Sequence, residues 1–134
     1  MIANARLYKS QMQIACHYVE VVCNANANYL SGSERSLNAI SVFDKERLQI
    51  ETSVEWLIRN ADDDEPGTYL IKLLRDGYQL LHARLDASEL QRWLYRGLEV
   101  ARRRNDQRSE AVQLIALGYA LRTKETYQQS HPFF

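Results

Sequence analysis

Two amphipathic helices joined by a short polar turn, between Ser88 and Leu121, constrain the fold of this chain more than any other feature. The first helix is predicted to carry its apolar residues at steps of three and four, at Leu90, Trp93, Leu94, Gly97, Leu98 and Ala101. The second repeats that spacing with Ala111, Leu114, Ile115, Gly118 and Leu121. Two such helices pack on each other and leave apolar surface for a neighbour. The pattern predicts an all-α fold built from antiparallel helical hairpins.

The first sixty residues are also predicted to be helical. A long N-terminal helix over about residues 3–30 carries two adjoining apolar stripes, one through Leu7, Ile14, Tyr18, Val21 and Ala25 and one through Met12, Ala15, Cys16, Val19 and Cys23. Ser33 is predicted to cap a short helix that reaches Phe43. Asp44 is predicted to begin a third helix that ends near Asn60, with a core stripe at Ile50, Val54, Leu57 and Ala61.

The acidic stretch at residues 61–67 is the clearest predicted loop, because a Pro-Gly turn signal follows its four acidic residues. The ligand spacing of a calcium-binding EF-hand is missing, so we interpret the stretch as a solvated linker. Thr68 is then predicted to cap a single helix with Leu70, Leu73, Leu74, Gly77, Tyr78 and Leu81 on one face. A polar turn from His82 to Asp86 precedes a capping box at Ser88 and Gln91. The last helix is predicted to end near Tyr127, and Phe133 and Phe134 could dock on the body.

Length and composition predict one domain over residues 1–134, comprising N-terminal helices (1–61), repeat-like helices (67–126) and a frayed tail (127–134). Only two prolines and five glycines interrupt the 134 residues, which favours long helices. Seventeen basic residues balance seventeen acidic ones, so no overall field attracts nucleic acid. No apolar run approaches the roughly 20 residues that span a bilayer, and no signal-peptide segment is evident. We expect a cytoplasmic protein.

Residues that could carry chemistry do not form a recognisable motif. Cys16 and Cys23 lie two helical turns apart, which predicts two reduced, packed thiols, with a disulfide across a dimer as the alternative. His17, His82 and His131 lie on separate predicted elements without metal-ligand spacing. No serine nucleophile elbow or placed acid–base pair is present. We therefore predict no catalytic residues, no metal site and no cofactor.

The segment from Leu70 to Leu121 resembles tetratricopeptide (TPR) repeats of about 40 residues. Helix A of one repeat matches Leu74, Tyr78 and Leu81, and its helix B matches Leu90, Leu94 and Gly97. A second helix A matches Leu114, Leu117, Gly118 and Leu121. The chain departs from the pattern where Tyr78 replaces a small residue, Leu90 an alanine and Arg102 the closing proline. The resemblance implies a TPR-like right-handed α-solenoid fragment that binds a protein or peptide.

An upstream stretch resembles the helical region that precedes the TPR array in bacterial NB-ARC/STAND signalling ATPases. The matching residues are Phe43-Asp44-Lys45-Glu46, Ile50 and Val54-Glu55-Trp56-Leu57. The resemblance implies a sensor or docking segment of a bacterial signalling or regulatory system. It does not imply ATP hydrolysis, because the chain has no phosphate-binding GxxxxGK[ST] motif.

Transferred to matching positions, the resemblance implies a concave binding face made of Lys72, Arg75, Gln79, His82, Tyr119 and Arg122. Lys72, Arg75 and Arg122 could bind carboxylates of an acidic or C-terminal peptide. The last helix lacks a following helix B, so we also predict a homodimer that covers Ile115, Leu117 and Tyr119. The alternative function is a nucleic-acid-associated regulator that uses Arg84, Arg92, Arg96 and Arg102–Arg104.

Overall fold

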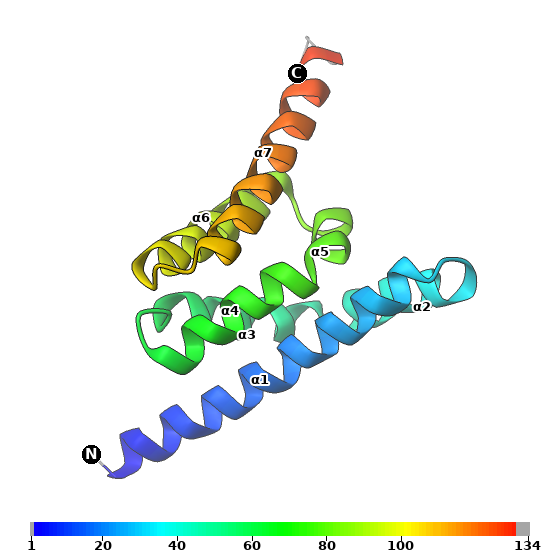
Figure 1. Ribbon diagram of the computed structural model, residues 1–134. Coiled ribbons are helices and arrows are strands. Elements are labelled where there is room, and N and C mark those ends of the chain that lie inside the picture. Colours follow the sequence, from blue (N-terminus) through cyan, green and yellow to red (C-terminus); the bar gives the residue numbers. More distant parts are fainter. Residues whose placement is uncertain (1, 131–134) are drawn as a thin grey trace.

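A computed structural model describes the backbone of residues 2–130 and the side chains of residues 3–122. The described residues form seven α-helices, as the sequence predicted for the fold class (Figure 1). Their bounds are α1 Ile2–Leu30, α2 Ser33–Lys45, α3 Arg47–Arg59, α4 Asp64–Asp76, α5 Tyr78–Arg84, α6 Ala87–Arg103 and α7 Gln107–Ser130. The last helix therefore ends at Ser130 and not near Tyr127, and the predicted docking of Phe133 and Phe134 lies outside the described residues.

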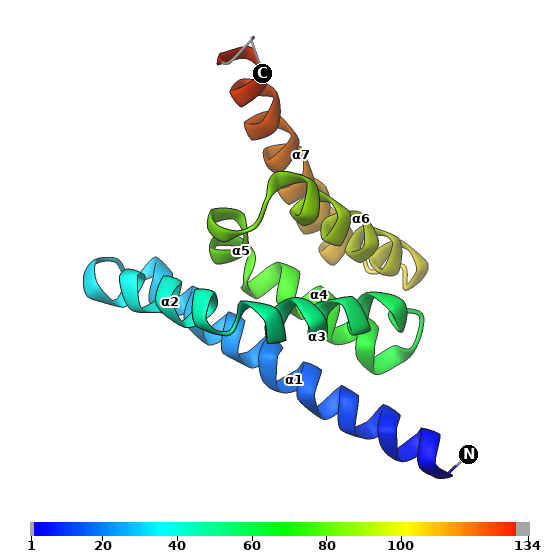
Figure 2. The ribbon, with the colours of Figure 1, turned by 180° about the vertical axis from the view of Figure 1, so that it is seen from behind.

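Helix α1 is the base of the molecule and contacts α2, α3, α4 and α5. Helices α2 and α3 run nearly end to end back along α1, as the two opposite views show (Figures 1 and 2). Helix α4 lies in the middle, because it contacts α1 and α3 on one side and α6 and α7 on the other. The α6–α7 hairpin forms the opposite side of the molecule, and the second half of α7 projects beyond it.

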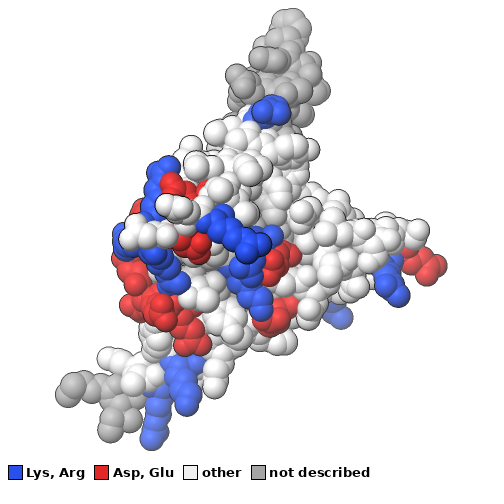
Figure 3. Space-filling model, viewed as in Figure 1, with Lys and Arg blue, Asp and Glu red and all other residues white. Residues whose placement is uncertain are grey.

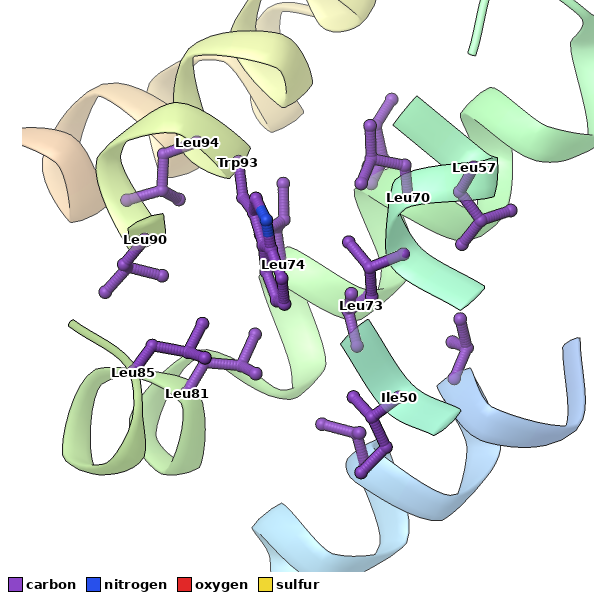
Figure 4. Close-up of a cluster of buried hydrophobic side chains, with 14 of the residues drawn as sticks. Ile50, Leu57, Leu70, Leu73, Leu74, Leu81, Leu85, Leu90, Trp93 and Leu94 are labelled. Atoms are coloured by element: carbon purple, nitrogen blue, oxygen red, sulfur yellow. The ribbon is translucent and has the colours of Figure 1, made fainter. Parts of the chain in front are cut away.

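The core is a continuous set of leucine-rich contacts centred on α4 (Figure 4). Leu70, Leu73 and Leu74 of α4 are fully buried, with Ile50 and Leu57 of α3 on one side. On the other side lie the buried residues Leu81, Leu85, Leu90, Trp93 and Leu94. The predicted apolar face of α6 is thus confirmed. Side chains from residues 12 to 120 belong to this one cluster.

The boundary at Ser33 differs from the prediction. Gly32 is the N-cap of α2, while Ser33 is the first helical residue and has a φ of 59°. The Ser36 hydroxyl donates to the Tyr29 carbonyl oxygen, which ties the start of α2 to the end of α1. The next boundary falls at Glu46 and not at Asp44, so α2 continues for two residues beyond Phe43.

The prediction of a loop at Pro66 and Gly67 is also wrong, because both residues lie in the first turn of α4. Proline is tolerated there, since the first amides of a helix have no partner within the helix. Thr68 does not cap α4, because its hydroxyl donates to the Asp64 carbonyl oxygen at 2.8 Å. Gly67 lacks the Cβ that would collide with the Arg104 guanidinium, and Arg104 donates to the Asp64 carbonyl oxygen at 2.6 Å.

The helix predicted from Thr68 to Leu81 is broken at Gly77 into α4 and α5. A Cβ at Gly77 would lie 2.9 Å from Cγ1 of Val22, so α1 approaches closely here. The break is stabilised by Asn26 of α1, whose Oδ1 accepts from the Leu80 backbone N–H at 2.8 Å. Its Nδ2 donates to Gln79 Oε1 at 3.0 Å. Asn26 thereby satisfies a first-turn amide of α5 that has no partner within the helix.

Helix α6 begins at Ala87 with Asp86 as its N-cap, so the predicted capping box at Ser88 is not formed. On α1 the stripe that includes Met12, Ala15 and Val19 is buried, whereas Leu7 and Ile14 of the other stripe are exposed. On α7 the predicted stripe faces solvent, and the helix packs through Gln113, Ala116, Leu117 and Ala120. No helix among the described residues is long and apolar enough to cross a membrane.

Candidate functional site: an apolar groove beside helix α7

An open groove of about 590 Å³ lies where the end of α1, the α4–α5 break and α7 come together. We call it the α5–α7 groove. Its lining residues are Tyr29, Leu30, Leu74, Arg75, Tyr78, Gln79, His82, Ala83, Val112, Ile115, Ala116 and Tyr119. At Gly77 α5 turns away from the axis of α4 (Figure 1), and Tyr78, Gln79, His82 and Ala83 of α5 line the groove together with residues of α7. The break is therefore what opens the groove.

Three rings line one wall of the groove in a row. The His82 ring lies between Tyr78 and Tyr119, with centroid distances of 5.7 Å and 5.1 Å. The Tyr78 hydroxyl donates to the Ala116 carbonyl oxygen at 3.2 Å, which joins α5 to α7. Burial raises the pKa of Tyr78, with a smaller contribution from Tyr119, so this phenol stays protonated at neutral pH. This part of the groove is therefore aromatic.

The polar lining of the groove is largely bound to neighbouring side chains. The Arg75 guanidinium donates to both carboxylate oxygens of Asp76, at 2.9 Å and 3.0 Å. This hydrogen-bonded fork lowers the pKa of Asp76. Gln79 accepts from Asn26, as described above. The groove therefore offers a ligand mainly apolar and aromatic surface.

The structure brings together four of the six residues predicted for a concave face. Arg75, Gln79, His82 and Tyr119 all line the α5–α7 groove. Lys72 lies in an adjoining depression and is paired with the Glu20 carboxylate, whose hydrogen bond raises the pKa of Lys72. Arg122 is exposed on α7 and does not line the groove. Because Lys72 and Arg75 already bind the chain's own carboxylates, the geometry favours an apolar ligand over an acidic one.

Sequence reasoning missed the part of the groove that α1 contributes. Tyr29 and Leu30 lie in the last turn of α1, and neither belongs to the two apolar stripes predicted for that helix. The signal was the row of asparagines that precedes them, since a buried Asn26 on a helix requires a partner from elsewhere in the chain. Val112 and Ala116 were missed because the opposite face of α7 was assigned to the core.

The residues predicted for self-association divide into two groups. Leu117 is only 5% exposed and belongs to the core, so it cannot contact another chain. Ile115 and Tyr119 are 74% and 53% exposed. Leu114 and Leu121 are exposed as well, at 44% and 42%. A single face of α7 therefore presents four large apolar side chains to solvent.

The arginines proposed for nucleic-acid contact are engaged in ion pairs with other parts of the chain. Arg84 forms a two-pronged pair with Asp44, and Arg92 binds both Glu55 and Glu89. The remaining pairs are Arg96 with Asp62 and Glu99, Arg102 with Glu110, Arg103 with Asp62 and Glu99, and Arg104 with Asp64. Charges of both signs intermingle on this side of the molecule (Figure 3). The surface over α5 and the visible part of α7 is mostly uncharged.

The described residues contain no group of three or more histidine, cysteine, aspartate or glutamate side chains that could hold a metal ion. Cys16 and Cys23 are free thiols, both partly buried. Among the residues that line the α5–α7 groove, His82 has neither a carboxylate nor a thiol beside it.

Comparisons of the chain with protein-family models, curated proteins and solved structures found no match.

Proposed function

We propose that this chain is a non-enzymatic protein-interaction module whose α5–α7 groove binds an apolar segment of a partner protein. The observation that carries the proposal is an open aromatic groove that continues into exposed apolar side chains of α7, Ile115 and Tyr119. Contiguous apolar surface of this kind is typical of interaction sites, and tyrosine is enriched in them. An amphipathic helix laid in the groove could anchor its apolar residues against the row of Tyr78, His82 and Tyr119.

The TPR resemblance is consistent with this role. Successive antiparallel helices pack on both sides of α4, which is the arrangement from which helical repeats are built. The break at Gly77 departs from a two-helix repeat, so we propose a TPR-like rather than a regular solenoid segment. The resemblance to the region before the TPR array of NB-ARC/STAND ATPases supports a partner from a bacterial signalling or regulatory system.

The nucleic-acid alternative has less support. Each arginine on which it depends lies beside a carboxylate of the chain itself, whose negative charge reduces the local attraction for phosphate. The 17 basic and 17 acidic residues also balance.

Site-specific photocrosslinking in the source cells tests the proposed function. A photoreactive phenylalanine analogue at Ala83 places the probe in the groove, and the same analogue at Thr52 of α3 is the matched control on a remote helix. We expect one defined adduct from the Ala83 probe, which disappears when His82→Glu is introduced. A pattern of adducts at Ala83 no different from that at Thr52 contradicts the proposal.

A further inference from the structure

The outward face of α7 carries three large apolar side chains that the described residues leave exposed, Leu114, Ile115 and Leu121. We define this face by Ala111, Leu114, Ile115, Gly118, Leu121 and Arg122. Gly118 lies at its centre, since the helical repeat of about 100° per residue places Ser109, Ala116 and Ala120 on the opposite, buried side. Helix α7 lies in front of α6 in Figure 1 and behind it in Figure 2, so α6 covers only one side of it.

The face that α7 buries is less apolar than the face it exposes. The buried face contains Gln113 and Ser109 beside one leucine and two alanines, whereas the outward face contains two leucines and an isoleucine. Neither Oε1 nor Nε2 of Gln113 has a hydrogen-bond partner among the described residues. Burial of the more apolar face is normally favoured in a monomer, because it removes more apolar area from water. The arrangement is explained if a second helix covers the outward face.

From this arrangement we infer that α7 pairs with α7 of a second copy of this chain, antiparallel and crossing at Gly118. This inference rests on the proposed interaction function and names the partner of one surface. The outward face is self-complementary about Gly118, because apolar residues follow it three positions on and precede it three and four positions back. In an antiparallel pair, Leu114 and Ile115 of one copy meet Leu121 of the other on both sides of the two-fold axis.

Gly118 allows the two α7 helices to approach each other closely at the crossing point. A Cβ built at this glycine has no atom of the described residues within 4 Å, so the glycine does not serve packing within the chain. A solvent-exposed glycine inside a helix is less favourable than alanine, which makes its position at the centre of an apolar face informative. Two backbones can come closest where both lack a side chain.

Charge selects the antiparallel arrangement. Arg122 is the one charged residue of the outward face as defined above. A parallel pair would place the two Arg122 side chains side by side. In an antiparallel pair each lies four residues from the axis on opposite sides, about 12 Å apart along the helices, which exceeds the Debye length of about 10 Å at 0.1 M salt.

The exposed area fits a weak dimer. The uncovered parts of Leu114, Ile115 and Leu121 amount to roughly 300 Å² per chain, or on the order of 600 Å² for the pair. Ala111, Gly118 and Arg122 bring the total to about 1,000 Å², which is the size of a weak interface. We therefore expect a dissociation constant in the micromolar range.

Sedimentation velocity on the whole chain, from about 1 to about 200 µM, measures the association. We expect a concentration-dependent dimer that Leu114→Glu with Leu121→Glu weakens at least tenfold. The matched control is Leu37→Glu with Leu48→Glu, which places the same charges on exposed leucines of α2 and α3 and leaves the dimer unchanged. A chain that stays monomeric throughout, or a dimer that the α7 variant does not weaken, overturns the inference.

Cysteine crosslinking gives the orientation without depending on how the glutamate variant folds. In a Cys16→Ser, Cys23→Ser background, Gly118→Cys should form a disulfide with its own copy. A mixture of Leu114→Cys and Leu121→Cys chains should crosslink to each other more than to themselves, and self-crosslinking at both positions would overturn the antiparallel pairing. If no dimer is found but the Ala83 probe still gives its adduct, only this inference is rejected. If a dimer is found but the Ala83 probe gives no adduct, only the proposed function of the groove is rejected.

Discussion

The side-chain amide of Asn26 forms two hydrogen bonds with α5, one with its backbone and one with a side chain. It is 4% exposed, donates to Gln79 and accepts from the Leu80 amide. Asparagine is a poor helix former, yet here its short amide replaces the missing first-turn partner of another helix. The position of α5, and hence one wall of the α5–α7 groove, depends on this residue.

Replacement of Asn26 by alanine should lower the free energy of unfolding by about 2 kcal/mol, because the buried Leu80 N–H then loses its acceptor. Urea denaturation followed by circular dichroism measures the change. Asn24→Ala is the control, since Asn24 lies on the same helix and is exposed. Equal effects of the two substitutions would contradict the role given to Asn26.

Cys23 should react slowly with alkylating reagents. Burial and the Asp76 carboxylate raise the pKa of its thiol to about 11 from 9.0, so the thiolate fraction at pH 8 falls by about 100-fold. In a Cys16→Ser variant, iodoacetamide should therefore modify the folded chain about 100-fold more slowly than the chain in guanidinium. Rates within threefold of each other would show that the thiol is accessible and unperturbed.

At the scale of the element, the buried face of α7 contains the side-chain amide of Gln113, which has no hydrogen-bond partner among the described residues. Gln113 is fully buried, and its side chain fits beneath Gly97 of α6, where a Cβ would lie 3.0 Å from Oε1. The absence of a side chain at Gly97 is thus what allows a long polar residue between α6 and α7.

Substitution of Gln113 by methionine should stabilise the chain by about 1 to 2 kcal/mol, since a side chain of similar volume replaces a buried amide that forms no hydrogen bond. Thermal and urea unfolding test this expectation. Gln107→Met, at an exposed position of the same helix, should change stability by less than about 0.5 kcal/mol. A destabilised Gln113→Met variant would show that the amide has a partner the geometry does not reveal.

Helical periodicity predicted the helical character of every element, but not the division of one predicted helix into α4 and α5, nor every face and boundary. The buried faces of α3 and α6 follow directly from the spacing of their apolar residues. On α7, Leu114 and Ile115 are more hydrophobic than Ala116 and Ala120. The pattern therefore predicted that the face with Leu114 and Ile115 is buried, whereas the structure exposes it. The break at Gly77 could not be predicted from local sequence, because Val22 and Asn26 lie on another helix.

At the scale of the whole molecule, arginine–carboxylate pairs connect the α3–α4 turn with the end of α6. Asp62 accepts from both Arg96 and Arg103, which outweigh its partial desolvation and lower its pKa. Such exposed pairs each contribute little in water, and salt weakens them further. Asp106 caps α7 by accepting from the Ser109 backbone N–H at 3.0 Å, and its hydrogen bonds with Ser109 lower its pKa.

The chain should therefore lose stability in acid. The pKa values of Asp76 and Asp106 lie below that of an unfolded aspartate, near ~4, so the folded state binds fewer protons. Their contribution is fully present above pH ~4 and is lost as the pH falls through the lowered folded values. Urea midpoints between pH 7 and about pH 2 should show this fall, and Asp106→Asn should make it shallower. If the urea midpoint of the variant falls with pH as steeply as that of the unmodified chain, Asp106 is excluded as a source of the acid sensitivity.

The candidate site was predictable where it depends on residues close together in sequence and not where it depends on distant helices. Arg75, Gln79 and His82 follow one another at helical spacing across α4 and α5, and the TPR resemblance selected that face. The α1 contribution from Tyr29 and Leu30 requires the tertiary arrangement, which no local pattern contains. The paired states of Lys72 and Arg75 likewise depend on carboxylates that a linear charge count cannot place.

The role of α1 as the base of the molecule has a consequence for biosynthesis. Its long-range contacts join residues far apart in sequence, with Tyr8 bound to Asp63 and Asn26 to Leu80. At a translation rate of about 5–20 residues per second, the N-terminal helix waits roughly 3–10 s for its partners. During that interval its apolar stripes have no native cover, while the α6–α7 hairpin can close as soon as it is made. Helix α1 therefore stays uncovered until α2 to α5 have been made, and chaperone capture during that interval should concentrate on it.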